Sequence, residues 1–334
     1  MKVRRAAVLG VLAVVLLLAA ALAAAAAWWL QRPLPLASDR VELSIEAGST
    51  PRQIANAWVA AGIQTSPWLL YEWFRWSGQA RRIRAGSYEI DRQVSPRQLL
   101  RKMVLGDETL ATVRIIEGWN FRQLRAELAR AEALRPTTAT LSDAEVMALL
   151  GAPALSPEGR FFPDTYAYSK GSTDLAVLQR AYHAMQQRLG AAWESRATDT
   201  PLRSADEALT LASIVEKETG VATDRPKVAG VFTNRLRLGM PLQTDPSVIY
   251  GLGTQFDGNL RKRDLQADTP YNTYTRAGLP PTPIAMPGKA SLEAAVRPEA
   301  TKALYFVARG DGSSEFSETL PAHNRAVNQY QRGK

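Results

Sequence analysis

The sequence predicts an α+β protein with a single apolar helix at its N-terminal end, a small first subdomain and a larger, mainly helical second domain. Three observations support this class. An uncharged run covers Ala6–Leu30, strand and helix patterns alternate between residues 41 and 90, and long helical patterns recur from residue 142 to residue 238. About 300 residues outside the apolar run are enough for two domains with their own cores.

The N-terminal segment 1–32 is expected to be a membrane anchor. The apolar run is long enough to cross a hydrocarbon core of about 30 Å, and Trp28 and Trp29 stand where interfacial aromatic residues belong. The basic residues Arg4 and Arg5 predict that the N-terminus lies in the cytoplasm and the bulk of the chain outside it. A cleaved signal peptide is the alternative, since Ala19–Ala27 is rich in small residues, but its apolar region is usually shorter.

The next segment, 33–108, shows a β-α-α-β order. After a proline-containing linker, the predicted elements are a strand at 41–48, a helix from Pro51 capped by Ser49 and Thr50, a helix at 67–76 and a strand at 85–90. This order resembles a LysM-like glycan-binding module. Four tryptophans could stack on sugars, but at helical spacing most of them are expected in the core: Trp58, Trp68, Trp73 and Trp76.

The remaining segment, 109–334, is expected to form the second domain. A strand at 112–116 turns at Glu117-Gly118 into a helix near Asn120. Helical patterns follow at 142–150, 173–197, 205–219 and 226–238, and a short strand near 303–307.

One predicted helix carries a glutamate on its apolar side. In LTLASIVEKETG (209–220), Glu218 lies in the i, i+3, i+4, i+7 series that starts at Leu211, whereas Glu216 and Lys217 fall on the opposite side, where charges normally sit. Burial of a carboxylate favours its protonated form, so Glu218 is a candidate general acid. The structural alternative is that Glu218 lies at the edge of the apolar side of the helix and pairs with a basic residue.

Polar loops follow this helix. The next helix, near Pro226–Leu238, places Arg235 in its apolar face and Asn234 beside that face. Gln243, Thr244 and Asp245 lie between two prolines, which predicts a stiff, irregular segment. Residues 269–288 combine amides, hydroxyls and aromatics with prolines, as expected of a rigid loop that lines a sugar site.

At these positions the chain resembles the YceG-like (MltG) family of endolytic murein transglycosylases. The matching segments occur in the family's order and are EGRFFPDTYAY (158–168), LASIVEKETG (211–220), VAGVFTNRLRLGMPLQTDPSVIYG (228–251), YNTYTRAGLPPTPIAMPG (271–288) and FSETLPAHN (316–324). The resemblance implies a lysozyme-like catalytic domain at 109–334 and assigns catalysis to Glu218, the second glutamate of EKE.

The implied reaction cuts the β-1,4 bond between N-acetylmuramic acid and N-acetylglucosamine within peptidoglycan glycan strands and leaves 1,6-anhydro ends, which would terminate or trim nascent glycan. Glu158 either orients the sugar or pairs structurally, and Asp245 either orients substrate or fixes its own loop. The residues expected to bind substrate are Glu158, Asn234, Gln243, Thr244, Asp245, Tyr250, Tyr271 and Asn272. A catalytically inactive wall-binding or division scaffold is the alternative function.

Composition limits the other chemistries. The chain has no cysteine, and His183 and His323 show no metal-ligand spacing, so no metal or cofactor is expected. The net charge is +9, but the basic residues are scattered apart from 81–84 and 261–263, which argues against nucleic acid as a partner. The expected partners are glycan strands and inner-membrane lipid, with peptidoglycan synthases as further candidates.

Overall fold

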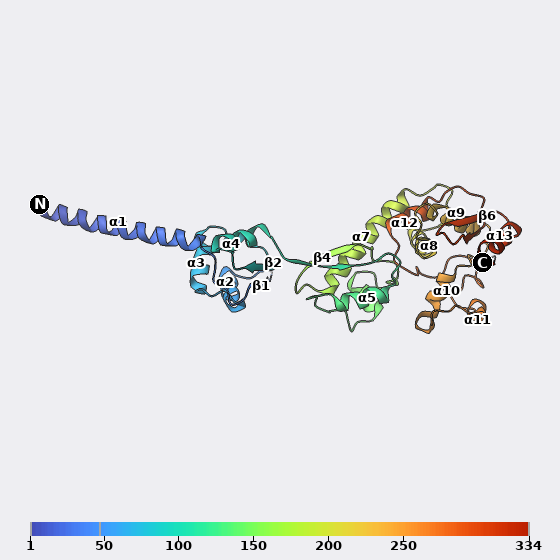
Figure 1. Cartoon of the computed structure of the whole chain (residues 1–334), viewed down its shortest axis with the longest axis horizontal. Coiled ribbons are helices and arrows are strands. Elements are labelled where there is room, and N and C mark those ends of the chain that lie inside the picture. The colour runs from blue at the N-terminus through green and yellow to red at the C-terminus, as the bar shows by residue number, and fades with distance from the viewer. Residues whose placement is uncertain (1, 47, 333–334) are drawn as a thin grey trace. The chain divides into compact units, whose positions relative to one another are not determined.

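The computed structural model describes residues 2–46 and 48–332 and divides into two compact units. Unit 1 comprises Met1–Ala111 together with Ala167–Ser172, and unit 2 comprises Thr112–Tyr166 with Thr173–Lys334. The chain therefore leaves unit 1, enters unit 2, and returns briefly to unit 1 before unit 2 is completed (Figure 1).

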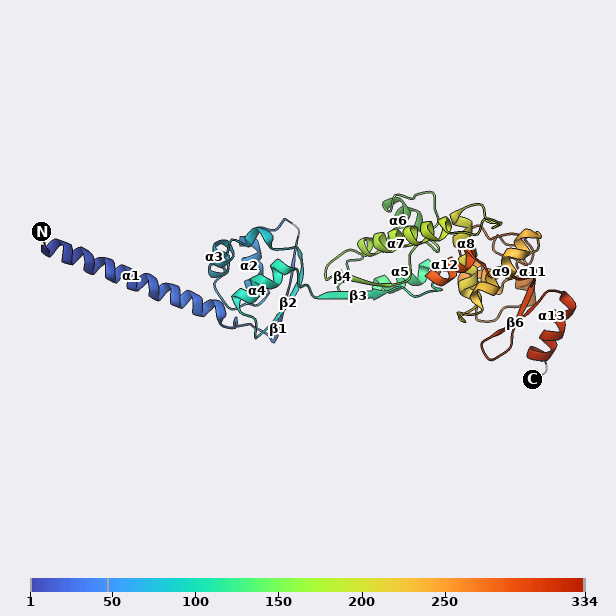
Figure 2. The same ribbon diagram turned by 90° about the horizontal axis from the view of Figure 1, so that it is seen from above.

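Unit 1 begins with the long helix α1, Lys2–Gln31. Its stretch Leu12–Gln31 is long and apolar enough to cross a membrane, and none of these residues is buried in the structure. Figures 1 and 2 show α1 as a single long helix at the N-terminal end of the chain. In the described part of the chain it is the one helix with these properties. At its end, Trp29 packs against the core of unit 1.

The rest of unit 1 is a two-stranded antiparallel sheet packed with three helices. The order is β1 (Arg40–Ile45), α2 (Pro51–Ala61), α3 (Pro67–Trp76), a 3₁₀ turn (Ala80–Arg82), β2 (Gly86–Asp91) and α4 (Pro96–Leu105). Val41 faces Ile90 across the sheet. Helix α2 begins at a capping box in which Thr50 and Gln53 bond each other's backbone, as the sequence predicts at this position. Trp58 and Phe74 fill the core.

Unit 2 is mainly helical. Its elements are β3 (Leu110–Arg114, which starts in unit 1), α5 (Phe121–Arg130), α6 (Asp143–Leu149), β4 (Thr165–Ser169, which ends in unit 1), α7 (Asp174–Glu194), α8 (Ala205–Glu218), α9 (Arg225–Arg237), α10 (Asp245–Leu252), a 3₁₀ turn (Gly253–Gln255), α11 (Lys262–Gln266), α12 (Lys289–Val296), β5 (Tyr305–Ala308), β6 (Ser314–Ser317), α13 (Leu320–Val327) and a final turn (Asn328–Arg332). Strands β3 and β4 pair, as do β5 and β6. The structure is thus of mixed helix and strand content.

Helix α8 is the centre of unit 2. It packs against α7, α9, α10 and α12, and Figure 2 shows it next to α9 and α12. All residues from Ala208 to Val215 are buried. A helix that is buried all round needs apolar or small residues on every side, which this sequence provides. The C-terminal end of α8 leaves this core, and there the chain places Glu216, Lys217 and Glu218.

One predicted segment differs from its observed structure. Residues 240–244 are irregular, as expected, but Asp245–Leu252 forms the helix α10. Pro246 is compatible with this helix because it lies in the first turn, where its missing N–H leaves no intrahelical bond unmade. The loop 269–288 contains no helix or regular strand, in agreement with the prediction.

Candidate active site

Glu218 is the last residue of α8 and is partly exposed, although protein surrounds most of its carboxyl group. The Thr244 hydroxyl donates a short hydrogen bond to Oε1 of Glu218. Thr244 is itself buried, and its backbone N–H donates to Oγ1 of Thr273 over 3.0 Å. The hydroxyl that touches Glu218 is therefore held between the segment before α10 and the 269–288 loop.

Burial raises the pKa of Glu218 to about 7, which is the largest effect on this group. The hydrogen bond from Thr244 lowers the pKa, the negative charge of Asp245 raises it, and the positive charge of Arg235 lowers it again. A carboxyl group with this pKa is populated in both protonation states near neutral pH. It is able to donate a proton and to take one back.

Arg235 is a buried cation on α9 whose charge acts on Glu218. Its Nε donates to the carbonyl of Leu304 over 2.7 Å, and Nη1 donates to the carbonyl of Leu242 over 2.9 Å and to that of Pro241 over 3.2 Å. Burial lowers the pKa of Arg235, and no carboxylate of the described chain lies within ion-pair distance of it. The sequence carried a signal for this residue, since an arginine lies in the apolar face of a helix.

Gln243 connects this cation to the loop before α10. Its Oε1 accepts from Nη1 of Arg235 over 3.2 Å, and its N–H donates to the carbonyl of Thr273 over 3.0 Å. The backbone of Gln243 has a φ of 53°, a left-handed conformation that is unfavourable for a residue with a side chain. These contacts hold Gln243 in that conformation and thereby position Thr244 beside Glu218.

A tyrosine completes this group of residues. The Tyr274 hydroxyl donates to Oδ1 of Asp245 over 2.6 Å. Burial raises the pKa of Tyr274, and the negative charges of Asp245 and Glu218 raise it further, so the hydroxyl keeps its proton. Tyr274 belongs to the polar cluster at 269–288, but no pattern in the sequence distinguishes it from its neighbours as a site residue.

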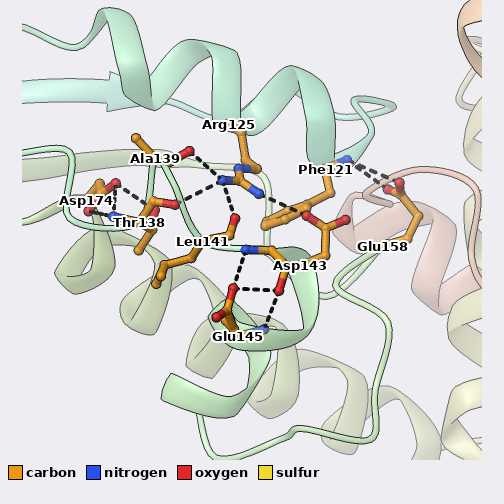
Figure 3. A network of polar contacts seen from close by, with 10 residues as sticks. Phe121, Arg125, Thr138, Ala139, Leu141, Asp143, Glu145, Glu158 and Asp174 are labelled. Carbon is orange, nitrogen blue, oxygen red and sulfur yellow. Dashed lines mark hydrogen bonds and ion pairs between the residues drawn. The ribbon is translucent and has the colours of Figure 1, made fainter.

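Glu158 forms a second buried carboxyl group, only 4% exposed. Its oxygens accept from the backbone N–H of Phe121 over 3.1 and 3.2 Å, and Oε2 accepts from the Tyr250 hydroxyl over 3.1 Å (Figure 3 shows the Phe121 bonds). Burial raises the pKa of Glu158 to about 7, although the hydrogen bonds from Phe121, Tyr250 and Gly159 oppose this shift. Glu158 thus caps the N-terminus of α5 and holds Tyr250 of α10.

The supporting loops of Glu158 are fixed on two sides. Gly159 has a φ of 77°, and a β-carbon there would lie 2.5 Å from Cβ of Pro283, so only glycine allows this approach. One helical turn further along α5, Arg125 donates to the carbonyls of Thr138, Ala139 and Leu141 and pairs with Asp143 over 3.0 Å (Figure 3).

A cavity of ≈ 800 Å³ adjoins Glu158. Tyr250 and Tyr271, whose rings meet edge to face with centroids 4.9 Å apart, form part of its wall together with Lys217. Glu218 is not among the lining residues. Helix α10 connects the two carboxyl groups, because Asp245 at its first residue acts on Glu218 and Tyr250 binds Glu158.

The two predicted asparagines bind backbone. Asn234 donates to the carbonyls of Thr301 and Ala303 over 2.8 and 3.1 Å. Asn272 is fully buried and donates to the carbonyl of Ala267 over 2.6 Å, among other carbonyls near α11. The structure thus uses both side-chain amide nitrogens to join segments of unit 2.

The expectation that Glu216 lies on a solvated face is wrong. Its side chain is 7% exposed, and its Oε2 accepts from the N–H of Gly288 over 2.9 Å and from the Ser291 hydroxyl over 2.7 Å. Nη2 of Arg225 lies 3.7 Å from Oε1 of Glu216. An apolar period predicts a solvated side opposite the apolar one, whereas α12 covers the side of α8 that carries Glu216. Glu216 anchors the start of α12.

The chain is similar to a known protein family and to named relatives. The sequence profile described as the YceG-like family matches residues 43–329. An endolytic murein transglycosylase of Bacillus subtilis (strain 168) is 42% identical over 173 residues, which are 52% of this chain and 48% of that protein. An endolytic murein transglycosylase of Streptococcus pneumoniae (serotype 2) is 27% identical over 327 residues, or 88% of this chain and 59% of that protein.

A crystal structure of a YceG-like protein from Listeria monocytogenes has 28% sequence identity and a TM-score of 0.54, and covers 86% of this chain and 99% of that one. The chain spans about half to three-fifths of the length of the two curated relatives.

Proposed function

The chain belongs to the YceG-like family, and on that premise we propose that it is an endolytic lytic transglycosylase of peptidoglycan. Its substrate is then the β-1,4 bond between N-acetylmuramic acid and N-acetylglucosamine within glycan strands. The observation that carries the proposal is the environment of Glu218, a largely enclosed but still accessible carboxyl group with a pKa of about 7 and a fixed hydroxyl donor on one oxygen.

In the proposed reaction, Glu218 acts first as acid and then as base. The protonated carboxyl group gives its proton to the glycosidic oxygen, the bond to C1 of the muramic acid breaks, and N-acetylglucosamine leaves with that proton. The ionised Glu218 then takes the proton of the C6 hydroxyl as its oxygen bonds to C1. Because the nucleophile is part of the substrate, no second carboxylate is needed to activate water, unlike in hydrolases.

The neighbours of Glu218 suit the two halves of this cycle. Thr244 occupies Oε1, which leaves Oε2 as the oxygen that carries the transferred proton. The charge of Asp245 favours the acid form needed for bond cleavage, and the charge of Arg235 favours the ionised form needed for closure of the anhydro ring. We assign Arg235 and Tyr274 as positioning residues on this basis.

The predicted binding residues fall into two proposed roles. Glu158, Tyr250 and Tyr271 border the ≈ 800 Å³ cavity and would form the wall against which a sugar lies. Gln243, Thr244 and Asp245 would place Glu218 and the reacting bond. Asn234 and Asn272 would contribute by fixing the loops that line the site.

The same premise extends to the other segments. Residues 33–108 would act as a LysM-like module that holds glycan, and 109–334 as a lysozyme-like catalytic domain. Helix α1 would anchor the chain in the inner membrane, with its N-terminus in the cytoplasm and the catalytic domain in the periplasm. Peptidoglycan synthases are the protein partners to test.

The test is the chemistry of the product. Purified protein is incubated with sacculi in H₂¹⁸O, and the new glycan ends are analysed by mass spectrometry. The proposal expects 1,6-anhydro ends without ¹⁸O. Reducing ends that carry ¹⁸O would show hydrolysis and overturn it, as would an absence of any cleavage by the folded protein.

A further inference from the structure

Unit 1 has a pocket at the end of α1 that the proposed glycan chemistry does not use. Its volume is ≈ 600 Å³. One wall consists of Ala27, Leu30 and Gln31 of α1, and the other of residues from the end of α3 and the start of α4. The lining residues on this second wall are Trp73, Ser77, Gln79, Arg97, Leu100 and Arg101.

Its position in the fold is fixed by contacts within unit 1. Trp29 packs against the core, and Nε1 of Trp73 donates to the carbonyl of Pro96 over 3.1 Å, which joins the end of α3 to the start of α4. The pocket therefore lies beside the last turn of the apolar helix. If α1 spans a membrane, as proposed above, this turn lies at the level of the lipid headgroups.

The charge around the pocket is positive. Arg97 and Arg101 are the charged side chains that line it, and no acidic residue is among its lining residues. Arg97 and Arg101 are one helical turn apart on α4, both are exposed, and within the described residues neither has a carboxylate at ion-pair distance. Arginine forks of this kind bind phosphate oxygens by paired hydrogen bonds.

Apolar aromatic residues occupy the same end of α3. Trp76 is 77% exposed, and its ring lies next to Arg75, whose guanidinium carbon is 5.5 Å from the ring centroid. A tryptophan in water is costly, but at a membrane surface its apolar body enters the acyl boundary and its N–H stays among polar groups. The combination of arginines and an exposed tryptophan matches a lipid surface better than a soluble anion.

We propose that this pocket binds the headgroup of an anionic phospholipid in the membrane that holds α1, with the phosphate on Arg97 and Arg101 and the acyl chains along Ala27 and Leu30. The inference rests on the proposed anchor. Bound lipid would hold unit 1 at the membrane surface, in addition to the anchoring by α1.

The experiment uses the full chain in nanodiscs that contain equal amounts of phosphatidylglycerol and phosphatidylcholine. After release, native mass spectrometry identifies the lipids that remain bound. We expect phosphatidylglycerol to be retained in preference to phosphatidylcholine. The double variant Arg97→Gln/Arg101→Gln should lose this preference, because each arginine is expected to contribute about fivefold to the ratio of the two bound lipids. The matched control, Arg114→Gln/Arg130→Gln, removes two exposed arginines of unit 2 and should keep it.

Equal retention of both lipids by the unmodified chain, or an unchanged preference in the Arg97/Arg101 variant, would overturn the proposal. Displacement of the lipid by 10 mM inorganic phosphate would also contradict it, because it would show a site for free phosphate. A chain that fails to insert into the nanodisc would refute the anchor instead, and the ¹⁸O experiment tests the catalytic proposal separately. Circular dichroism of the variants checks that they are folded.

Discussion

At the scale of single residues, the two glutamates at the end of α8 are expected to behave differently. Glu218→Gln retains shape and polarity but cannot exchange a proton, so we expect the cleavage rate to fall at least ~10²-fold with little change in melting temperature. Purified variants are assayed on sacculi and melted by circular dichroism. The assignment fails if Glu218→Gln stays close to normal activity.

Glu216→Gln is the matched variant, because it makes the same change two residues away. Glu216 binds Gly288 and Ser291 and lies near Arg225, so we expect a loss of stability of about 1–3 kcal/mol. The cleavage rate below the melting transition should remain close to that of the unmodified chain. A folded, stable and inactive Glu216→Gln variant would contradict both assignments.

The rate should depend on pH in a direction set by Glu218. The pKa of this group is about 7, and the first step needs the protonated form in the free protein. The protonated fraction decreases as pH rises through 7, so kcat/KM should fall on the alkaline side with a midpoint near pH 7. A profile of kcat/KM on soluble glycan strands checks this. A rate that stays constant from pH 6 to pH 9 would exclude Glu218 as the acid.

Arg235 provides a test of positioning that structural damage alone would not reproduce. Its charge lowers the pKa of Glu218, so Arg235→Gln should move the alkaline limb of the pH profile to higher pH. Arg235→Lys retains the charge but loses the fork that reaches Pro241, Leu242 and Leu304, so it should be less stable with the limb nearly unmoved. An unmoved limb in a folded Arg235→Gln variant would mean that the cation acts only by holding backbone.

At the scale of elements, α10 connects the two carboxyl groups of unit 2, and a double-mutant cycle measures this connection. Tyr250→Phe removes the hydroxyl that donates to Glu158 over 3.1 Å, and should cost about 1 kcal/mol of stability and raise KM more than it lowers kcat. In the double variant Tyr250→Phe/Glu158→Gln, the loss of stability and the rise in KM should be clearly smaller than the sum of those in the two single variants. Fully additive effects would show that the two side chains act independently.

Element boundaries could be predicted from the sequence wherever local chemistry determines them. The capping box at Thr50 and the proline after it place the start of α2, and Pro67 in the first turn places the start of α3. Helix α10 could not be predicted in this way, because proline on both sides of QTD favours irregular structure until tertiary contacts position its first turn. Helices α4, α11, α12 and α13 and strands β4 and β6 were not predicted either.

The candidate site was predicted in part, for a similar reason. The segment of polar residues around Thr244 and the glutamates of α8 are visible in the sequence. Periodicity predicted a solvated position for Glu216 because it assumes that one side of a helix faces water. This is wrong for α8, since protein covers nearly all of its sides. Arg235 is marked in the sequence by its place in the apolar face of a helix, but its contacts, like those of Tyr274, depend on loops that only the folded chain brings together.

At the scale of the whole molecule, the anchor should be separable from the rest of the chain. Removal of residues 1–27 leaves Trp29 in place on the core of unit 1, so the truncated protein should be soluble and should still cut glycan. Fractionation of cells that express either the full chain or the truncated protein tests the solubility, and the sacculus assay tests the cleavage of glycan. A truncated protein that still sediments with washed membranes would show that α1 is not the sole anchor.

Unit 1 is completed by a segment that is synthesised much later than the rest of it. The Ser87 hydroxyl donates to the carbonyl of Lys170 over 2.7 Å, and the Ser169 hydroxyl donates to Glu108. While the chain emerges N-terminus first, these bonds must wait until more than fifty further residues have followed residue 111. The order of synthesis therefore delays the completion of unit 1 until the first part of unit 2 has been synthesised.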